Sequence, residues 1–183
     1  MKYRWQKYID SPKYTSQQLY HELKHGDVIF CYEYDCQNFM NKTLLKYFNY
    51  NISHGSLIIE ENGEKFLIES NPGLQSDFPH RTVSVYQTLN GPWNVIKIPL
   101  MEHIMTYGTF IYQVLRPETP IPLTLYYPEP STSTLYYCTM LVGDMLHHHG
   151  VIPKSTRLAR YRTTELIQLL KEAGYNTFYL MKC

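Results

Sequence analysis

The sequence predicts an α+β fold in a single domain, taken as residues 1–183. Three observations indicate this class: helical patterns stand near the start and in the last third of the chain, strand patterns fill the middle, and an Asn-Gly turn joins two of those strands. A chain of 183 residues is long enough to bury a sizeable core in one domain.

The first expected element is a helix that begins after Thr15. Thr15 and Gln18 have the spacing of a capping box, and Leu19 and Leu23 fall on one helical face. Gly26 suits the C-terminal end, because glycine readily adopts the left-handed conformation at which many helices stop. The elements expected next are a strand over DVIFCY, 27–32, and an amphipathic helix over 38–49.

A β-hairpin is expected around Asn62-Gly63. Two apolar, strand-like runs flank this dipeptide in HGSLIIEENGEKFLIES, 54–70, and Asn-Gly is the strongest short signal for a two-residue turn. Such a turn pairs residue 61 with residue 64 and so sets the register of both strands. Further strands are expected at 94–100 and 109–116, followed by a proline-rich loop over 117–130.

The last third of the chain carries two helical patterns and a final strand. TELIQLLKEAG, 164–174, starts at a threonine that suits an N-cap and ends at a glycine, and TFYLMK, 177–182, is typical of a strand. The earlier pattern covers 138–149 and stops at Gly150, with one apolar stripe at helical spacing. The stripe consists of Cys138, Leu141, Val142, Met145, Leu146 and His149.

Composition and charge exclude several classes of protein. The chain is 44% hydrophobic and 18% charged, which is typical of a globular protein. Its net charge is +1 and it has no Lys/Arg block, so nucleic acid is not an expected partner. We find no secretory signal and no apolar run long enough to span a membrane. Four scattered cysteines are too few for a disulfide scaffold, so an intracellular, cytoplasmic location is expected.

Cys138 stands where a thiol can become a nucleophile. It opens the predicted helix, and the unpaired N–H groups at a helix N-terminus lower a thiol pKa by stabilising the thiolate. Thr134, four residues earlier, suits the cap of that helix. The alternative interpretation is that Cys138 is simply the first buried residue of the apolar stripe, because cysteine is among the most buried residue types.

The predicted hairpin register brings a histidine and a carboxylate together. Ser56 then faces Glu69, and His54 and Glu69 become diagonal neighbours on one face, with Cβ atoms roughly 7–8 Å apart. A cysteine nucleophile needs such a base and a third group that holds the base. A register slip of one residue would put the two side chains on opposite faces. The alternative is a surface histidine beside a surface glutamate.

One cysteine pair and one run of histidines resemble metal-binding motifs, but neither has the spacing that a metal site needs. Cys31 and Cys36 form a C-x₄-C pair, but the chain has no second pair of this kind. His147, His148 and His149 are consecutive, and consecutive helical residues point about 100° apart, so they do not converge on one ion. We therefore expect no metal site and no cofactor.

Five short motifs follow one another along the chain. They are HGDVIF (25–30), SHGSLII (53–59), IESNPG (68–73), VLRP (114–117) and YYCTMLVGDML (136–146). Their order and spacing resemble the circularly permuted papain-like fold of the NlpC superfamily. Its members include the bacterial YiiX/YebB-like proteins, the lecithin:retinol acyltransferase group and a poxvirus family. The similarity covers about residues 25–173.

The resemblance implies a fold and a catalytic triad. The fold would be an antiparallel sheet or half-barrel packed against the helix that carries the nucleophile. Cys138 matches the nucleophile, His54 the base and Glu69 the third polar position. The implied activity is that of a cysteine hydrolase (an amidase or peptidase) or an acyltransferase acting on amide, ester or thioester bonds. Thr139 departs from the family pattern, in which Ser more usually follows the cysteine.

The substrate and the alternative functions stay open at this stage. Peptide, amino-acyl and lipid acyl substrates all fit the resemblance, and tyrosines near Cys138 suit an acyl groove or peripheral contact with a membrane or lipid. The alternative function is a catalytically inactive binding module, or a virion or host-interaction protein on the same fold, with a virion-associated location if the protein is viral. The sequence does not indicate an oligomeric state.

Overall fold

The computed structural model describes residues 12–33, 54–72, 82–88, 91–106, 110–125, 138–155 and 161–182. For some of the strand residues, His54 among them, only the backbone is described. The described helices are α2 (Ser16–Glu22), α4 (Leu100–Thr106), α5 (Cys138–His148) and α6 (Thr163–Glu172). The described strands are β1 (Lys13–Tyr14), β2 (Val28–Glu33), β3 (His54–Glu61), β4 (Glu64–Pro72), β5 (Thr82–Thr88), β6 (Gly91–Pro99), β7 (Phe110–Pro117) and β8 (Tyr175–Lys182).

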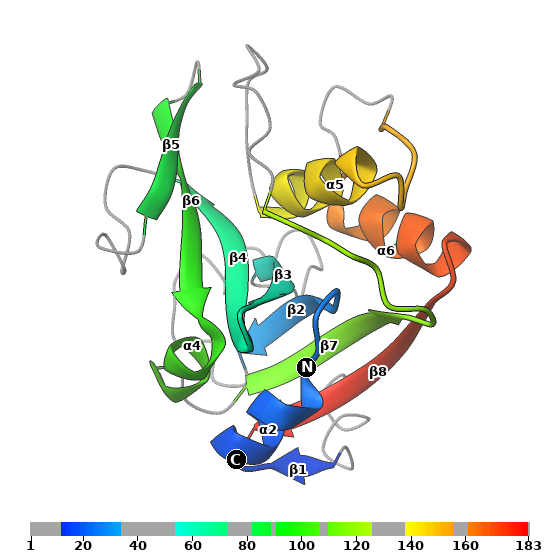
Figure 1. Cartoon of the computed structure of the whole chain (residues 1–183). Helices are drawn as coiled ribbons and strands as arrows, with labels where there is room; N and C mark the ends of the chain where they lie inside the picture. Colours follow the sequence, from blue (N-terminus) through cyan, green and yellow to red (C-terminus); the bar gives the residue numbers. More distant parts are fainter. Residues whose placement is uncertain are drawn as a thin grey trace, which may run out of the picture.

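One sheet runs through the described part of the chain, so the α+β prediction is confirmed (Figure 1). Its strand order is β1-β8-β7-β2-β3-β4-β6-β5. Neighbouring strands are antiparallel except β1 and β8, which pair in parallel. The sheet is therefore mixed rather than antiparallel. Parallel pairing joins strands that are far apart in the sequence, so no local pattern indicates it.

The hairpin forms with the predicted turn and register. Asn62 and Gly63 both have positive φ angles, 52° and 79°, as a type I′ turn requires. Glu61 pairs with Glu64, and the same register continues to the pair of Leu57 and Ile68. The predicted pairing of residue 61 with residue 64 is confirmed.

The first helix starts as predicted but ends earlier. The Thr15 hydroxyl accepts the N–H of Gln18, and the Gln18 side chain accepts the N–H of Thr15, so the capping box is complete. The helix stops at Glu22 instead of continuing to Gly26, because Leu23 is already extended. Gly26, with φ of 85°, instead shapes the turn into β2.

Several boundaries and short elements differ from the prediction. Residues 118–125 contain no helix or strand, as expected, whereas the predicted helix over 38–49 and the loop residues 126–130 lie outside the described residues. Helix α6 has Arg162 at its N-cap without a side-chain hydrogen bond, so the predicted threonine cap is wrong. The sequence prediction omits β1, β5 and α4. Strand β1 has only two residues and α4 only seven, whereas the TVSVYQT of β5 is rich in strand-forming residues, a signal that could have found it.

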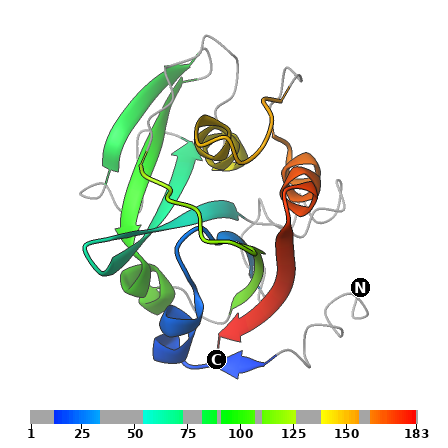
Figure 2. The same ribbon diagram turned by 45° about the vertical axis from the view of Figure 1, so that its right-hand side comes forward.

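Helices cover both faces of the sheet, and each face has its own hydrophobic cluster. Helices α5 and α6 lie on one face, and α2 and α4 lie on the other (Figures 1 and 2). Along β2, the side chains alternate between the two clusters, Phe30 toward α5 and Ile29 toward α2 and α4. The sheet curves around α5, which packs against β3 and β4 (Figure 2).

Helix α5 is buried on more than one side, so the single predicted stripe is too narrow. Its residues from Thr139 to Leu146 are all buried, including Gly143 and Asp144 outside the stripe. Gly143 packs directly against the ring of the fully buried Tyr161. The curved sheet on one side and this ring on another enclose the helix, which a one-sided amphipathic pattern does not anticipate.

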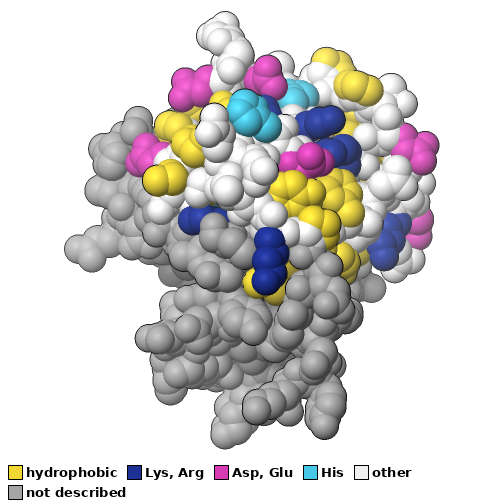
Figure 3. Space-filling view, turned by 90° about the horizontal axis from the view of Figure 1, so that it is seen from below, with side chains coloured by type: hydrophobic (Ala, Val, Ile, Leu, Met, Phe, Trp, Pro, Cys, Tyr) yellow, Lys and Arg dark blue, Asp and Glu magenta, His cyan; other side chains and the backbone are white. Residues whose placement is uncertain are grey.

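The described surface around α2 and α4 carries both signs of charge. Figure 3 shows acidic and basic side chains interleaved there, with small hydrophobic groups between them. This mixture agrees with the net charge of +1 for the whole chain. Among the described residues, no helix has the length and apolar character needed to cross a membrane.

Candidate active site

Cys138 is the first described residue of α5, within the helix that the sequence predicts over 138–149. Its side chain is half-buried, and the first turn of the helix contains no acidic residue. The N-terminal end of a helix carries a partial positive charge, which favours a thiolate over a thiol. The predicted cap, Thr134, lies outside the described residues. Position and surroundings therefore suit an activated cysteine as well as a packed one.

The N-terminus of α5 touches the start of β3. A Cβ atom placed on Gly55 would lie 3.1 Å from Cγ2 of Thr139. His54 precedes Gly55 and Cys138 precedes Thr139, so each proposed catalytic residue is one position away from this contact. The contact therefore brings the strand segment that contains His54 against the first described turn of the helix that contains Cys138. The His54 ring itself lies outside the described atoms.

Glu69 is a buried carboxylate on β4. Only 3% of its surface is exposed, and its Oε2 accepts a hydrogen bond from the hydroxyl of the fully buried Ser56 at 3.5 Å. The two residues face each other across β3 and β4, as the predicted hairpin register requires. Glu69 is therefore held inside the molecule and is not the surface glutamate of the alternative interpretation.

Cys31 lies beside His54 in the sheet, a position that the sequence does not indicate. It is directly opposite His54 in the pairing of β2 with β3, and only 3% of its surface is exposed. Burial raises the pKa of its thiol well above the usual range, and the negative charges of Glu69 and Cys138 raise it further. Cys31 therefore stays protonated, and both Glu69 and Cys138 are close enough to act on it electrostatically.

The buried polar side chains lie on the face of the sheet that points away from α5. Along the strands, Cys31, Ser56 and Glu69 alternate with residues that pack against α5, so these three side chains lie on the sheet face opposite the body of that helix. Cys138 and His54 are the first described residues of α5 and β3. Cys138 is nevertheless close enough to Cys31 to act on its thiol electrostatically.

The HGDVIF and VLRP motifs are joined by an ion pair that does not include Cys138. Asp27, of the HGD motif, accepts hydrogen bonds from Nε and Nη2 of Arg116, of the VLRP motif, both at 2.8 Å. Asp27 also accepts the N–H of Lys24 at 2.8 Å. Burial is the main cause that raises the pKa of Asp27, and the hydrogen bond from Arg116 opposes that effect. These motif residues join β2 to β7 and have a structural role.

The histidines at the end of α5 contact backbone carbonyl groups. His147 Nδ1 lies 3.1 Å from the carbonyl of Ile152, and His149 Nε2 lies 3.1 Å from the carbonyl of Thr124. No cluster of three or more potential metal ligands occurs among the described residues, and Cys36 is outside them. The two histidines thus bond different backbone groups and hold the loops beside the end of α5.

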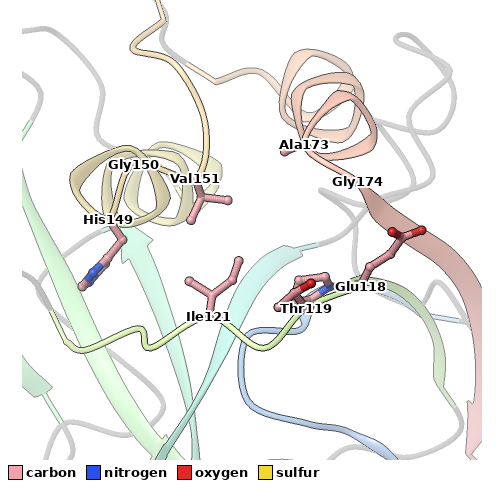
Figure 4. A pocket seen from close by; sticks show the side chains of 9 residues that line it. Glu118, Thr119, Ile121, His149, Gly150, Val151, Ala173 and Gly174 are labelled. Atoms are coloured by element: carbon pink, nitrogen blue, oxygen red, sulfur yellow. The ribbon is translucent and has the colours of Figure 1, made fainter.

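A pocket of about 400 Å³ lies at the opposite end of α5 (Figure 4). The turns that follow α5 and α6, at Gly150 and Gly174, form one side, and Glu118 and Ile121 of the connector after β7 form the other. At about 1.5 Å of rise per residue, the 11 residues of α5 separate this pocket from Cys138 by about 16 Å. The pocket therefore does not adjoin the thiol.

No family model, curated protein or solved structure matches the chain. The likeness to permuted papain-like proteins therefore depends on the five sequence motifs and on how the structure arranges them.

Proposed function

We propose that this protein is a cysteine-dependent hydrolase or acyltransferase of the permuted papain-like class. Cys138 is the nucleophile, His54 is the general base and Glu69 orients the base. Peptide, amino-acyl or lipid acyl groups in amide, ester or thioester linkage are the substrates, and a cytoplasmic, reducing location keeps the thiol active. The observation that carries the proposal is the close approach of Gly55 and Thr139, which brings the strand segment that contains His54 against the helix that contains Cys138.

The buried carboxylate supports the same assignment. Glu69 lies on β4 beside the strand that begins with His54, and a carboxylate there stabilises the imidazolium that forms when His54 takes a proton. Ser56 holds the carboxylate by a hydrogen bond. The three residues then have the roles of a cysteine triad: Cys138 attacks, His54 takes the proton and Glu69 orients the histidine.

The mechanism has two steps. His54 removes the proton of the Cys138 thiol, the thiolate attacks the acyl carbonyl, and the imidazolium returns the proton to the leaving amine, alcohol or thiol, which leaves a thioester. His54 then deprotonates water or another acceptor, which attacks the thioester and releases the acyl group as the thiol re-forms. The N–H of Cys138, at the helix N-terminus, donates to the oxyanion.

Acyl trapping with p-nitrophenyl acetate tests the proposal. The wild-type protein should release p-nitrophenolate and carry one acetyl group on the peptide that contains Cys138, whereas Cys138→Ala should carry none. His54→Ala should lower the acylation rate by roughly 10²–10⁴-fold, the usual contribution of a general base. Cys31→Ala identifies the acylated thiol: the acetyl group should still appear on the Cys138 peptide, because Cys31 is buried and protonated. Equal acylation of wild type and Cys138→Ala would exclude the mechanism.

The alternative is a non-catalytic binding or host-interaction module on the same fold. The observation that favours it is that Glu69 and the body of α5 lie on opposite faces of the sheet. Such a module predicts no acetyl adduct on Cys138 in the same experiment, together with an ordinary thiol pKa near 8.5.

A further inference from the structure

Gly55 is the point of closest approach between β3 and the start of α5. A Cβ atom on this residue would lie 3.0 Å from Cε1 of Phe30 and 3.1 Å from Cγ2 of Thr139. Both distances are shorter than ordinary van der Waals contact between carbon atoms, about 3.5–4.0 Å. Any larger residue at position 55 must therefore push the helix, the Phe30 ring or the strand away.

The backbone conformation at position 55 does not require a glycine. Gly55 is not among the glycines with positive φ, and it lies inside a strand, where glycine weakens the sheet. A strand glycine of this kind commonly marks a place where another part of the protein comes close. Here that part is the first turn of the helix that carries Cys138.

Thr139 fills the space that the missing side chain leaves. Only 2% of its surface is exposed, and its methyl carbon is the atom that faces Gly55. Its hydroxyl is buried and has no hydrogen-bond partner among the described residues. A buried hydroxyl without a partner costs free energy, so the structural contribution of Thr139 comes from its methyl group.

We propose that Gly55 and Thr139 are positioning residues, whose contact sets the distance between the Cys138 sulfur and the His54 base. This inference rests on the proposed function. The contact lies one residue from Cys138 on the helix and one residue from His54 on the strand, so a change in it moves the two groups relative to each other. A misplacement of about 1 Å in an active site can lower the rate about 10²-fold.

Three variants of the pair test the inference in the whole chain. Gly55→Ala adds a methyl group 3.1 Å from Cγ2 of Thr139, so the helix or the strand must shift by a few tenths of an ångström. We expect the acylation rate with p-nitrophenyl acetate to fall about tenfold, with little change in the half-saturating concentration. Gly55→Ala/Thr139→Ser removes the threonine methyl that the added group contacts, so it should recover part of the rate. The recovery should be incomplete, because the Phe30 ring still contacts the added group. Thr139→Val keeps the methyl and removes the unpaired hydroxyl, so it should acylate as the wild type does.

Gly63→Ala is the matched control on the same hairpin. Gly63 has φ of 79°, and a Cβ atom placed on it would have no neighbour within 4 Å, so this change strains the turn without altering the spacing at Cys138. Its acylation rate should stay near that of the wild type at temperatures where the protein is folded. An equal loss in Gly63→Ala and Gly55→Ala would assign the effect to a weakened hairpin and overturn the inference.

The remaining outcomes separate this inference from the proposed function. If wild-type Cys138 forms no acetyl adduct, the proposed function fails and the inference fails with it. If the wild type is acylated and Gly55→Ala acylates equally fast, only the inference fails. A loss in Thr139→Val would assign the role to the hydroxyl and also overturn it. The pH dependence of iodoacetamide alkylation at Cys138 gives a second readout, since a displaced base should raise the pH of half-maximal reaction in Gly55→Ala.

Discussion

The two described cysteines differ in chemistry because their surroundings differ. Cys138 is half-buried at a helix N-terminus, where the dipole favours the thiolate. Cys31 is buried in the sheet, and burial together with nearby negative charge raises the pKa of its thiol. Two thiols that lie close enough to interact therefore stand in different surroundings, one in the sheet interior and one half-buried on α5.

We predict that iodoacetamide at neutral pH alkylates Cys138 and leaves Cys31 unmodified. The thiolate is the reactive form, and only Cys138 has surroundings that stabilise it. Peptide mapping by mass spectrometry measures both sites in one sample. In urea, both cysteines should react, which shows that the fold protects Cys31. Comparable alkylation of the two in the native protein would contradict the described burial.

Arg116 is expected to be necessary for the buried Asp27. The Asp27 carboxylate is fully buried and accepts two hydrogen bonds from the guanidinium. Removing one partner of a buried ion pair typically costs about 3–5 kcal/mol, so Arg116→Ala should lower the free energy of unfolding by about this much at pH 7. Asp27→Asn should cost less, because the amide does not bury a charge. Urea denaturation measures both changes.

The cost of Arg116→Ala should depend on pH. Burial raises the pKa of Asp27 above its usual value of 3.8, and losing Arg116 removes the main opposing cause. An acid with a raised pKa in the folded state stabilises the protein at low pH, and this contribution is lost as the pH rises through that pKa. The deficit of Arg116→Ala relative to wild type should therefore be smaller at pH 5 than at pH 7. An equal or larger deficit at pH 5 would contradict the assignment.

At the scale of single elements, local interactions account for the parts that the sequence predicts well. The Thr15 capping box and the Asn62-Gly63 turn depend on residues within three positions of each other. The same is true of the end of α6 at Gly174, whose φ is 85°. Helix α4 is different, because its seven residues follow β6 directly and pack against α2.

Gly143→Ala should destabilise the protein, although alanine is the better helix former. The exchange favours the helix by about 1 kcal/mol, but a Cβ at position 143 would overlap the Tyr161 ring. Overpacking costs typically about 1–3 kcal/mol, and the overlap here is severe, so a net loss is expected. Thermal unfolding should show a melting temperature lower by a few degrees. In a Tyr161→Leu background, the same change should cost less; equal costs would exclude the contact as the cause.

At the scale of the whole molecule, the central strands belong to both hydrophobic clusters. Strands β2 and β3 send alternate residues to each face, such as Leu57 toward α5 and Ile58 toward α2 and α4. Strand β1, in contrast, has two residues and pairs only with β8 among the described strands. The two faces should therefore unfold together, and β1 should open first.

Native-state hydrogen exchange can check this coupling. We predict that Leu19→Ala on one face and Leu141→Ala on the other each lower the protection of the β2 and β3 amides, by about 2–5 kcal/mol for a buried leucine. The loss should equal the loss of global stability in each variant. If each substitution affected only the amides that face its own cluster, the two halves would be independent. Amides of β1 should exchange fast in all variants.

The sequence by itself determined the fold class, most helices and strands, and the hairpin register that puts Ser56 opposite Glu69. These features depend on hydrogen bonds and backbone preferences of residues close together in the chain, and on periodicities of 2 and 3.6 residues. It also indicated Cys138, His54 and Glu69 as candidates, through their motifs.

Only the tertiary structure decided which distant residues meet. It paired β1 with β8, set Cys31 opposite His54, joined Asp27 to Arg116 across 89 positions, and brought Thr139 against Gly55. Such contacts depend on how the sheet curves and how the helices fill the space beside it, and they become favourable only after the chain between them has closed. The spacing at Gly55 is set by packing of this kind.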